Sequence, residues 1–457
     1  MQRRSLRDLN DWGTVDIEAL TMSIRSRLAI ELSYALTTFT LLSTMKGQTP
    51  GSGFPIFQCV DLLDEALDLL EDEAFHGEEE TLDSEPAEDS RITTHRQLIK
   101  MIFEEESEVF AGLTHRPGSN NPNFGSRQRP GGIILTITNI IRNLSIIPDN
   151  ISFLAQHERL LDLMLRVCTV THDGCKPLPA SPVLSPSDLI IARKDVLYTL
   201  INLTGMIQFS THSTRMMRVA RRAFTLVASY LIDPAECVSP LAYIQQSGVL
   251  SSGNLKPPSL SDIALEVFTR LSQSDSNRQV LSQILPQTTV WSLLEALVHR
   301  LPILDADFQL VARELWLSYV EKIVMAIYSL AFLAPPQLKL KIKTDRNLGF
   351  TKVMFRMVQK FLTNPHPDGR VWFSVCARRA IEAMKVVDDG EDVFDTSQAA
   401  TSPTISFGMG YGEVGESDKQ TGTGLLGGYR EVTWDLLMLR EVDDVMFAEL
   451  ESMARVG

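Results

Sequence analysis

The chain has 457 residues, of which 44% are hydrophobic and 22% are charged, and its formal net charge at pH 7 is −14. These proportions are ordinary for a folded soluble protein, and they exclude a collagen-like, low-complexity or wholly disordered chain. Five cysteines are too few for a disulfide framework in a chain of this length, which favours a reducing compartment.

The N-terminal part predicts a short leader, a helical unit and an acidic insert. Residues 1–11 carry basic side chains with no apolar segment behind them, so no secretory signal is expected. Helical periodicity then runs over 12–70. The insert, 71–92, is acidic, because 71–89 hold ten Asp or Glu and no Lys or Arg. We interpret it as a disordered, solubilising insertion, with a contact for a basic partner such as a histone tail as the alternative.

Residues 93–395 are dominated by helical periodicity, which is clearest at 139–167. Ile140, Leu144 and Ile147 fall on one helical face, and Pro148 ends that helix because it cannot continue the hydrogen-bond ladder. A second apolar helix follows at once. Two short amphipathic helices cannot bury both faces alone and need stacked neighbours. The intervening loops, rich in Pro, Gly, Ser or Asn, are 116–132, 174–187 and 247–259.

The same phrase occurs twice in this region. Leu144-Ser145 is followed by Asn150, and Leu271-Ser272 is followed at the same spacing by Asn277. Each phrase continues into two large apolar residues, and weaker echoes occur elsewhere in the chain. Recurrence of one helix–turn–helix pattern predicts an all-α, armadillo-like helical repeat solenoid with long disordered inserts.

The C-terminal third contains two ambiguous segments and a predicted cap. The alternating run 338–343 follows two prolines, and we favour a short helix over a strand there. The apolar run 323–334 is shorter than the roughly 18 residues of a membrane span, so we expect a core helix and no membrane contact. Residues 396–430 are a Gly-rich linker, and 431–457 predict C-terminal capping helices.

Two patterns resemble sites for a cofactor or a metal ion but lack the necessary context. The sequence GYGEVG at 410–415 matches G-x-G-x-x-G without a strand before it or a helix after it. Cys168, His172 and Cys175, with His157 upstream, fit no standard zinc spacing. Catalytic motifs are also missing. We therefore expect no enzyme activity, no cofactor, no metal and no small-molecule substrate.

A cluster of arginines is the candidate partner-binding site. Arg215, Arg218 and Arg222 recur on one face of a predicted helix at 213–232, and Arg221 flanks them. Guanidinium groups at this spacing suit an acidic helix or a phosphate backbone. A solvated helix face is the alternative interpretation.

Taken in order, several segments resemble the C-terminal core of the large ARID-bearing subunit of SWI/SNF chromatin-remodelling complexes, the fungal branch in particular. The resemblance covers roughly 12–395. Its pieces, besides the acidic insert, are WGTVDIEALTMSIRSRLAIELSYALTTFTLLS, NIIRNLSIIPDN, ARKDVLYTLINLTGMIQFS, SLSDIALEVFTRLSQSDSNRQVL and CARRAIEAMKVVDD.

This resemblance implies a nuclear, non-catalytic armadillo-like scaffold. Such a hub holds other SWI/SNF core subunits and the helix that precedes the ATPase domain of the motor subunit. The family's ARID domain has no counterpart in these residues, so only indirect or weak nucleosome contact is expected. The alternative is a cytoplasmic armadillo-type peptide or cargo adaptor, although the five tryptophans show none of the regular period of a peptide-binding groove.

Overall fold

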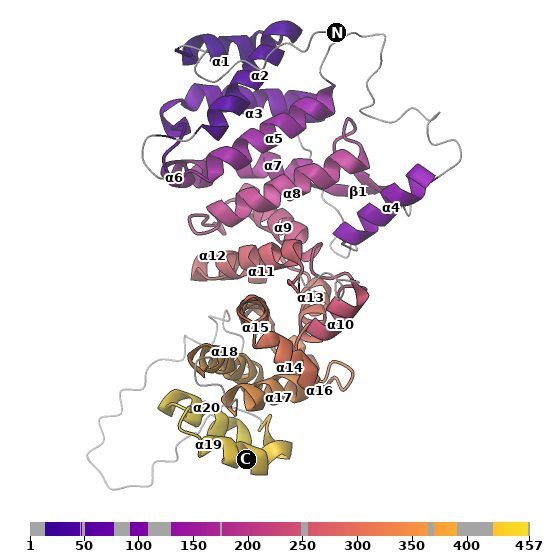
Figure 1. Ribbon diagram of the computed structural model, residues 1–457, viewed down its shortest axis with the longest axis vertical. Helices are drawn as coiled ribbons and strands as arrows, with labels where there is room; N and C mark the ends of the chain where they lie inside the picture. Colours follow the sequence, from indigo (N-terminus) through magenta and orange to yellow (C-terminus); the bar gives the residue numbers. More distant parts are fainter. Residues whose placement is uncertain are drawn as a thin grey trace, which may run out of the picture. The chain divides into compact units, whose positions relative to one another are not determined.

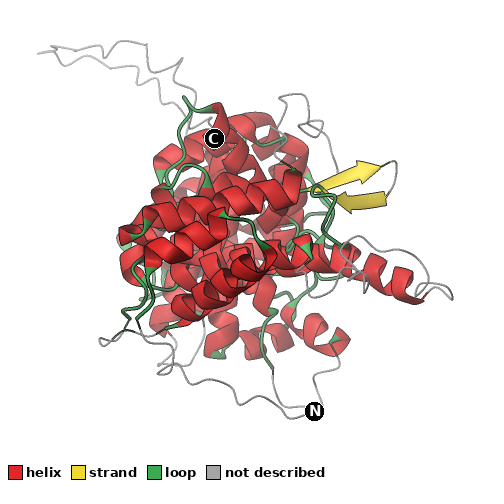
Figure 2. Ribbon diagram, turned by 90° about the horizontal axis from the view of Figure 1, so that it is seen from above, coloured by secondary structure: helices red, strands yellow, loops and turns green. Residues whose placement is uncertain are grey.

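The protein is predominantly helical, as the sequence predicts. The computed structural model describes residues 14–45, 47, 51–76, 92–107, 129–173, 176–247, 255–363, 370–390 and 424–455. These residues form twenty α-helices, two 3-10 helices and one β-hairpin (Figures 1 and 2). Contacts divide the chain into unit 1 (Met1–Ile207 with Thr214–Leu226) and unit 2 (Gln208–Ser213 with Val227–Gly457).

Unit 1 contains the first eight helices, the hairpin and nearly all of the ninth helix. Its elements are α1 (Ile17–Arg25), α2 (Ala29–Thr44), η2 (Ile56–Gln58), α3 (Val60–Phe75), α4 (His95–Ser107), α5 (Pro130–Ser145), α6 (Pro148–Gln156), α7 (Leu160–Val167), β1 (Val170–Asp173), β2 (Lys176–Pro179), α8 (Pro186–Leu203) and α9 (Thr214–Ala228). The helices α2, α5 and α8 pack in succession, and α3 packs against α1, α5 and α7 (Figure 1). Their shared faces bury aliphatic side chains and Phe39, whose removal from water is the main stabilising contribution.

The start of α8 shows how local sequence and packing agree. Ser185 caps the helix by accepting a hydrogen bond from the Asp188 amide at 3.1 Å, and the Asp188 carboxylate accepts one from the Ser185 amide. Arg129, just before α5, donates two 2.7 Å hydrogen bonds to the same carboxylate. Burial raises the pKa of Asp188, but the hydrogen bonds from Arg129 and Ser185 outweigh burial and hold that pKa below its ordinary value.

Unit 2 contains the remaining helices. They are α10 (Pro240–Gln246), α11 (Ser259–Leu271), α12 (Asp275–Ile284), α13 (Gln287–His299), α14 (Asp305–Val311), α15 (Glu314–Leu333), α16 (Pro336–Thr344), α17 (Phe350–Leu362), α18 (Arg370–Asp389), η8 (Gly427–Tyr429), α19 (Arg430–Leu437) and α20 (Asp444–Ala454). The long helix α15 packs against α11, α13 and α18. Buried Arg300, at the end of α13, connects two other parts of this core. It donates a hydrogen bond to the Tyr319 hydroxyl on α15 at 3.0 Å and another to the Leu231 carbonyl at 2.9 Å.

By length and composition alone, α15 is the one helix among the described residues that is suited to cross a membrane. It is longer than the apolar run 323–334 that the sequence singles out. Most of its side chains, including Trp316 and Ile323, are buried against other helices of unit 2. Burial to this extent is typical of a core helix, as the sequence predicts for 323–334.

Several predicted boundaries differ from those in the structure. Helix α3 continues to Phe75, so the acidic residues Glu71 and Asp72 belong to an ordered helix and not to the insert that follows. The predicted loop 174–187 contains β2, which pairs antiparallel with β1 in the register Val170 to Pro179 (Figure 2). The run 338–343 lies in α16, so the predicted helix is confirmed. The leader 1–11 and the GYGEVG sequence at 410–415 lie outside the described residues.

The two copies of the repeated phrase adopt matching corners, and the first is closed by Asn150. This fully buried side chain accepts a hydrogen bond from the Ile56 amide at 3.1 Å. Its amide group donates to the carbonyls of Phe54 and Leu144 at 3.0 and 3.2 Å. Gly53 lies close by, and a Cβ there would come within 2.5 Å of Ile147. The loop before α3 is therefore fastened to the α5–α6 corner.

In unit 2, Asn277 makes the same kind of corner between α11 and α12. It is buried, accepts from the Phe209 amide at 2.7 Å and donates to the Leu271 carbonyl at 2.9 Å. In both copies the asparagine side chain bridges the carbonyl six residues earlier and the amide of a distant loop. Leu144 and Leu271 are 0% and 4% exposed, as their equivalent positions predict.

Candidate functional site

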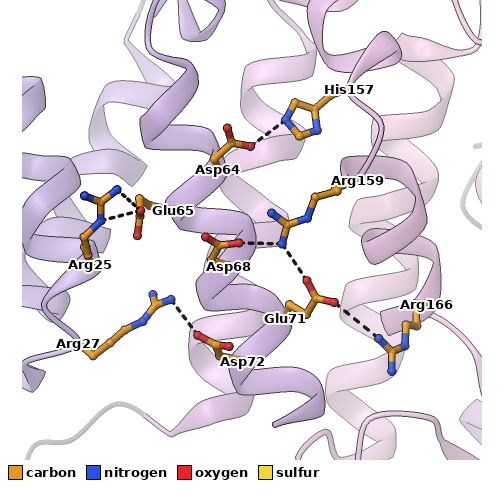
Figure 3. A network of polar contacts seen from close by, with 10 residues as sticks. All are labelled: Arg25, Arg27, Asp64, Glu65, Asp68, Glu71, Asp72, His157, Arg159 and Arg166. Atoms are coloured by element: carbon orange, nitrogen blue, oxygen red, sulfur yellow. Dashed lines mark hydrogen bonds and ion pairs between the residues drawn. The ribbon is translucent and has the colours of Figure 1, made fainter. Parts of the chain in front are cut away.

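An acidic helix with basic groups on both flanks forms the basis of the candidate site. The apolar residues of α3 face the core of unit 1, and its carboxylates lie on the remaining surface. On one flank, Arg25 and Arg27 of the α1–α2 corner pair with Glu65 and Asp72 (Figure 3). The opposite flank of α3 faces α7 and the residues just before it.

On that second flank, Arg159 joins two carboxylates of α3. Its Nη2 lies 2.7 Å from Asp68 and 2.8 Å from Glu71 (Figure 3). Burial lowers the pKa of Arg159, but the hydrogen bonds that it donates to both carboxylates outweigh burial and raise its pKa overall. Arg166, two turns further along, lies 3.9 Å from Glu71 and stacks over the Phe75 ring at 3.8 Å. The guanidinium groups of Arg159 and Arg166 are thus held in place by contacts on α3.

The arginines predicted to bind a partner lie on α9, and two of them contact α7. Arg215 and Arg222 share one carboxylate, because each lies 2.9 Å from an oxygen of Asp162. All four predicted arginines, which include Arg218 and Arg221, are half-buried. The cluster is therefore not a fully solvated helix face.

These contacts enclose a pocket of about 430 Å³ in unit 1, which we call the arginine pocket. Its lining residues come from α3, α7 with the residue before it, and α9, and they are Glu71, Arg159, Asp162, Leu163, Arg166, Arg215 and Arg218. Four guanidinium groups thus surround two carboxylates. Such a site is suited to bind an anion through paired N–H donors. Its lining contains no Ser, Thr, Cys, His, Lys or Tyr.

The sequence analysis found the α9 half of this pocket and missed the α7 half. Arg159, Asp162 and Arg166 recur at i, i+3 and i+7, which places them on one helical face. That stripe was a detectable signal, but it lies in a segment whose apolar residues dominate its pattern. Its pairing with α9 spans 53 and 60 residues of sequence and depends on tertiary packing.

The residues considered for a metal site have other partners or lie apart. The Nε2 of His157 is 3.1 Å from Asp64, and the Nε2 of His172 is 2.9 Å from the Thr93 hydroxyl. Cys168 is buried, and burial raises the pKa of its thiol to about 12. Cys175 lies outside the described residues. Within the described part of the chain, no group of three or more His, Cys, Asp or Glu is arranged to hold a metal ion.

Comparison with known proteins gives one informative result. No family model matches the chain. Over 212 residues it is 26% identical to the "SWI/SNF chromatin-remodeling complex subunit sol1" of Schizosaccharomyces pombe. The aligned region covers 44% of this chain and 23% of that protein, so the chain matches less than a quarter of the relative's length. The chain is thus distantly related, over part of its length, to a SWI/SNF subunit.

Proposed function

We propose that this protein is a nuclear, non-catalytic scaffold subunit of a SWI/SNF-type chromatin-remodelling complex. The observation that carries the proposal is its partial identity with a SWI/SNF subunit. In this role the chain holds other core subunits and the helix before the ATPase domain of the motor subunit. Its effect on remodelling is exerted through assembly, with only weak or indirect contact to the nucleosome.

An armadillo-like solenoid is the architecture that best accounts for the repeated corners. Asn150 and Asn277 occupy equivalent positions in two helix–turn–helix segments, and each fastens the loop of a preceding segment. In a solenoid, each repeat contacts mainly its neighbours, so each repeat is expected to contain the same corner. The recurrence of one buried polar contact in both units supports this architecture.

Hydrogen bonds between helices that are not adjacent in sequence support the same interpretation. Each bond lies near the C-terminal end of one helix and involves a buried serine hydroxyl. The pairs are Ser43 with Asn143 at 3.2 Å, Ser145 with Asn202 at 2.9 Å, and Ser272 with Ser329 at 2.9 Å. They join α2 to α5, α5 to α8 and α11 to α15. We infer that such helices form a layer within each unit and that α19 and α20 close the C-terminal end of unit 2.

One observation favours the alternative of an armadillo-type cargo adaptor. A groove of about 390 Å³ lies between α2 and α5 and is lined by Thr37, Thr40, Thr136 and Asn139 together with leucines. Polar side chains at the base of such a groove are able to bind the backbone of an extended peptide. This second function places the chain in the cytoplasm with a peptide partner.

Affinity purification of the tagged full-length chain, followed by mass spectrometry, tests the proposal. We expect the ATPase and core subunits of a SWI/SNF-type complex in amounts close to that of the bait. The control is the same tag on an unrelated nuclear protein. Recovery of transport or cargo proteins without remodeller subunits would establish the adaptor alternative.

A further inference from the structure

We propose that the outer face of α19 binds a basic amphipathic helix of a protein partner. This surface, which we call the α19 face, consists of the exposed residues Glu431, Trp434, Asp435 and Met438. The inference rests on the proposed function only in requiring a protein partner. Exposed apolar side chains, a firmly held helix beneath them and negative charges beside them each support it.

Two large apolar side chains of the α19 face lie in water. Trp434 is 50% exposed and Met438 is 82% exposed, whereas Thr433, Leu436 and Leu437 on the inner side of the helix are buried. Because they are four residues apart, the two exposed side chains lie one turn apart on the same side of α19. The last helices of a helical array are expected to have a polar outer face. Tryptophan and methionine are instead enriched in protein–protein interfaces, which indicates a binding surface here.

The helix that carries this surface is held firmly against the rest of unit 2. It packs against α20 (Figure 1). The Tyr429 ring, just before α19, contacts the Phe355 ring of α17, with 5.1 Å between the ring centroids. The Nε of Arg430 donates a hydrogen bond to the Ala454 carbonyl at the end of α20 at 3.2 Å. A surface that is already ordered loses little conformational entropy on binding, so its contacts contribute more of their energy to affinity.

The charges near the exposed apolar pair are mostly negative. Residues 430–449 include six acidic and two basic side chains, which gives this segment a net charge of −4. Glu431 and Asp435 lie beside the apolar pair, and neither forms an ion pair within the part of the chain that the structure describes. Of the two basic residues, Arg430 bonds to α20 and Arg440 lies beyond the end of α19. Lysine or arginine beside the apolar face of a partner would complement this surface.

The same charges argue against a nucleic acid or a membrane as the partner. Nucleic acids and the cytoplasmic leaflet of membranes are negatively charged, so the carboxylates of the α19 face would repel both. The apolar and acidic pairs form two parallel rows, each with the spacing of one helical turn. An amphipathic helix that lies alongside α19 presents an apolar row and a basic row with the same spacing.

The test measures binding of labelled peptides to the full-length protein by fluorescence anisotropy. The probe is an amphipathic peptide of about 16 residues, long enough to form a helix, with leucines on one face and lysines beside them. One control peptide has glutamate in place of each lysine, and another has glutamine in place of each leucine. A DNA duplex is the fourth ligand. We expect the lysine peptide to bind, both control peptides to bind at least about tenfold more weakly, and DNA not to bind.

Two matched double variants test whether the apolar pair carries the binding. Trp434→Ala with Met438→Ala should weaken binding of the lysine peptide about tenfold or more and leave the circular dichroism spectrum unchanged, because both side chains are exposed. The control, Ile30→Ala with Tyr34→Ala, removes an exposed pair at the same spacing from α2 of unit 1. It should leave peptide binding unchanged.

A charge reversal tests the acidic row. Glu431→Lys with Asp435→Lys should reverse the preference between the peptides, so that the glutamate peptide binds more tightly than the lysine peptide. Binding of the lysine peptide to the unchanged protein should weaken as salt is raised, because exposed charges are screened. A merely structural role for the two carboxylates predicts no reversal.

The proposal fails if the lysine and glutamate peptides bind equally, if the α2 control weakens binding as much as the α19 variant, or if the charge reversal leaves the preference unchanged. Binding that appears only after deletion of 1–11 or of 396–420 would assign the α19 face to a segment of the same chain and overturn the assignment to a partner. Self-association that Trp434→Ala with Met438→Ala abolishes would assign the surface to a second copy and likewise overturn it.

The scaffold proposal and the α19 proposal can fail separately. A chain that co-purifies with remodeller subunits but does not bind the lysine peptide overturns the α19 proposal alone. Binding of the lysine peptide by a chain that recovers no remodeller subunits overturns the scaffold proposal alone.

Discussion

Replacing Asn150 with alanine removes three hydrogen bonds from a fully buried corner of unit 1. The Ile56 amide and the carbonyls of Phe54 and Leu144 would lose their side-chain partner, at present distances of 3.0 to 3.2 Å. Backbone hydrogen bonds to these groups remain, so each lost side-chain hydrogen bond costs about 0.5–1.5 kcal/mol. We therefore expect Asn150→Ala to destabilise unit 1 by about 3 kcal/mol.

The equivalent change in unit 2, Asn277→Ala, should have a similar effect. Asn277 bridges the Phe209 amide and the Leu271 carbonyl at 2.7 and 2.9 Å, so about 2–4 kcal/mol is expected. Asn347 is exposed and supplies the control, Asn347→Ala, which should change stability by less than about 0.5 kcal/mol. Comparable losses at the two corners and none at the control are what a shared repeat requires.

A third variant, Asn150→Asp, keeps the shape of the side chain and adds a pH dependence. The carboxylate still accepts from the Ile56 amide but faces the Phe54 and Leu144 carbonyls, and burial and these oxygens raise its pKa in the folded state. A folded-state pKa above the unfolded value gives stability that is present at low pH and lost as pH rises through the folded-state pKa. The variant should therefore approach wild-type stability only in mild acid.

Native-state hydrogen exchange is the appropriate assay, because two units need not unfold in a single transition. Protection of amides around 54–58 and 144–150 should fall in Asn150→Ala, and protection around 209 and 271–277 should fall in Asn277→Ala. Urea denaturation followed by circular dichroism gives the size of the loss. If either variant keeps wild-type protection at its corner, the asparagine is not what fastens the loop, and the equivalence of the two corners is refuted.

Three further changes test other parts of the fold. Burial, followed by nearby Arg193 and Lys194, lowers the pKa of His95 to about 4. The stability that depends on neutral His95 is complete above about pH 6.5 and is lost as pH falls towards 4, so the protection factors of amides in α4 should fall in acid, and His95→Gln should abolish that fall. Gly53→Ala should destabilise the loop before α3 by about 1–3 kcal/mol in thermal melts, because its Cβ would meet the Ile147 side chain at 2.5 Å. Asp388→Ala should expose the segment that begins near residue 424 to limited proteolysis, because the buried Asp388 carboxylate accepts from the Leu425 amide at 3.1 Å; an unchanged digestion pattern would exclude this anchoring role.

Helical class and much of the core were predictable because they depend on local periodicity. Leu144 and Leu271 are buried as their matching positions predict, and α16 forms where two prolines precede an ambiguous run. The end of α3 was misplaced because acidic composition was taken as a sign of disorder. The helix continues through Glu71 and Asp72 because Ala74 and Phe75 beyond them are buried in the core. Both carboxylates also pair with arginines outside the helix, which no local pattern reveals.

The candidate site was only half predictable for the same reason. The spacing of Arg215, Arg218 and Arg222 marks a basic face, but a sequence does not say which helix lies opposite. Two of these arginines form ion pairs with Asp162, which lies more than fifty residues earlier in the sequence. The hairpin was missed because its strands are four residues long and β2 contains two prolines, which gives no alternating pattern to detect.

The most direct test of the scaffold proposal is sedimentation of the remodelling complex with and without this chain. Nuclear extracts from cells that contain the chain and from cells depleted of it are separated on a glycerol gradient, and the ATPase subunit is followed through the fractions. We predict that depletion shifts the ATPase to lighter fractions while its DNA-stimulated ATPase activity persists, because the chain contributes assembly and not chemistry. An ATPase that sediments unchanged in the depleted extract would contradict the proposal.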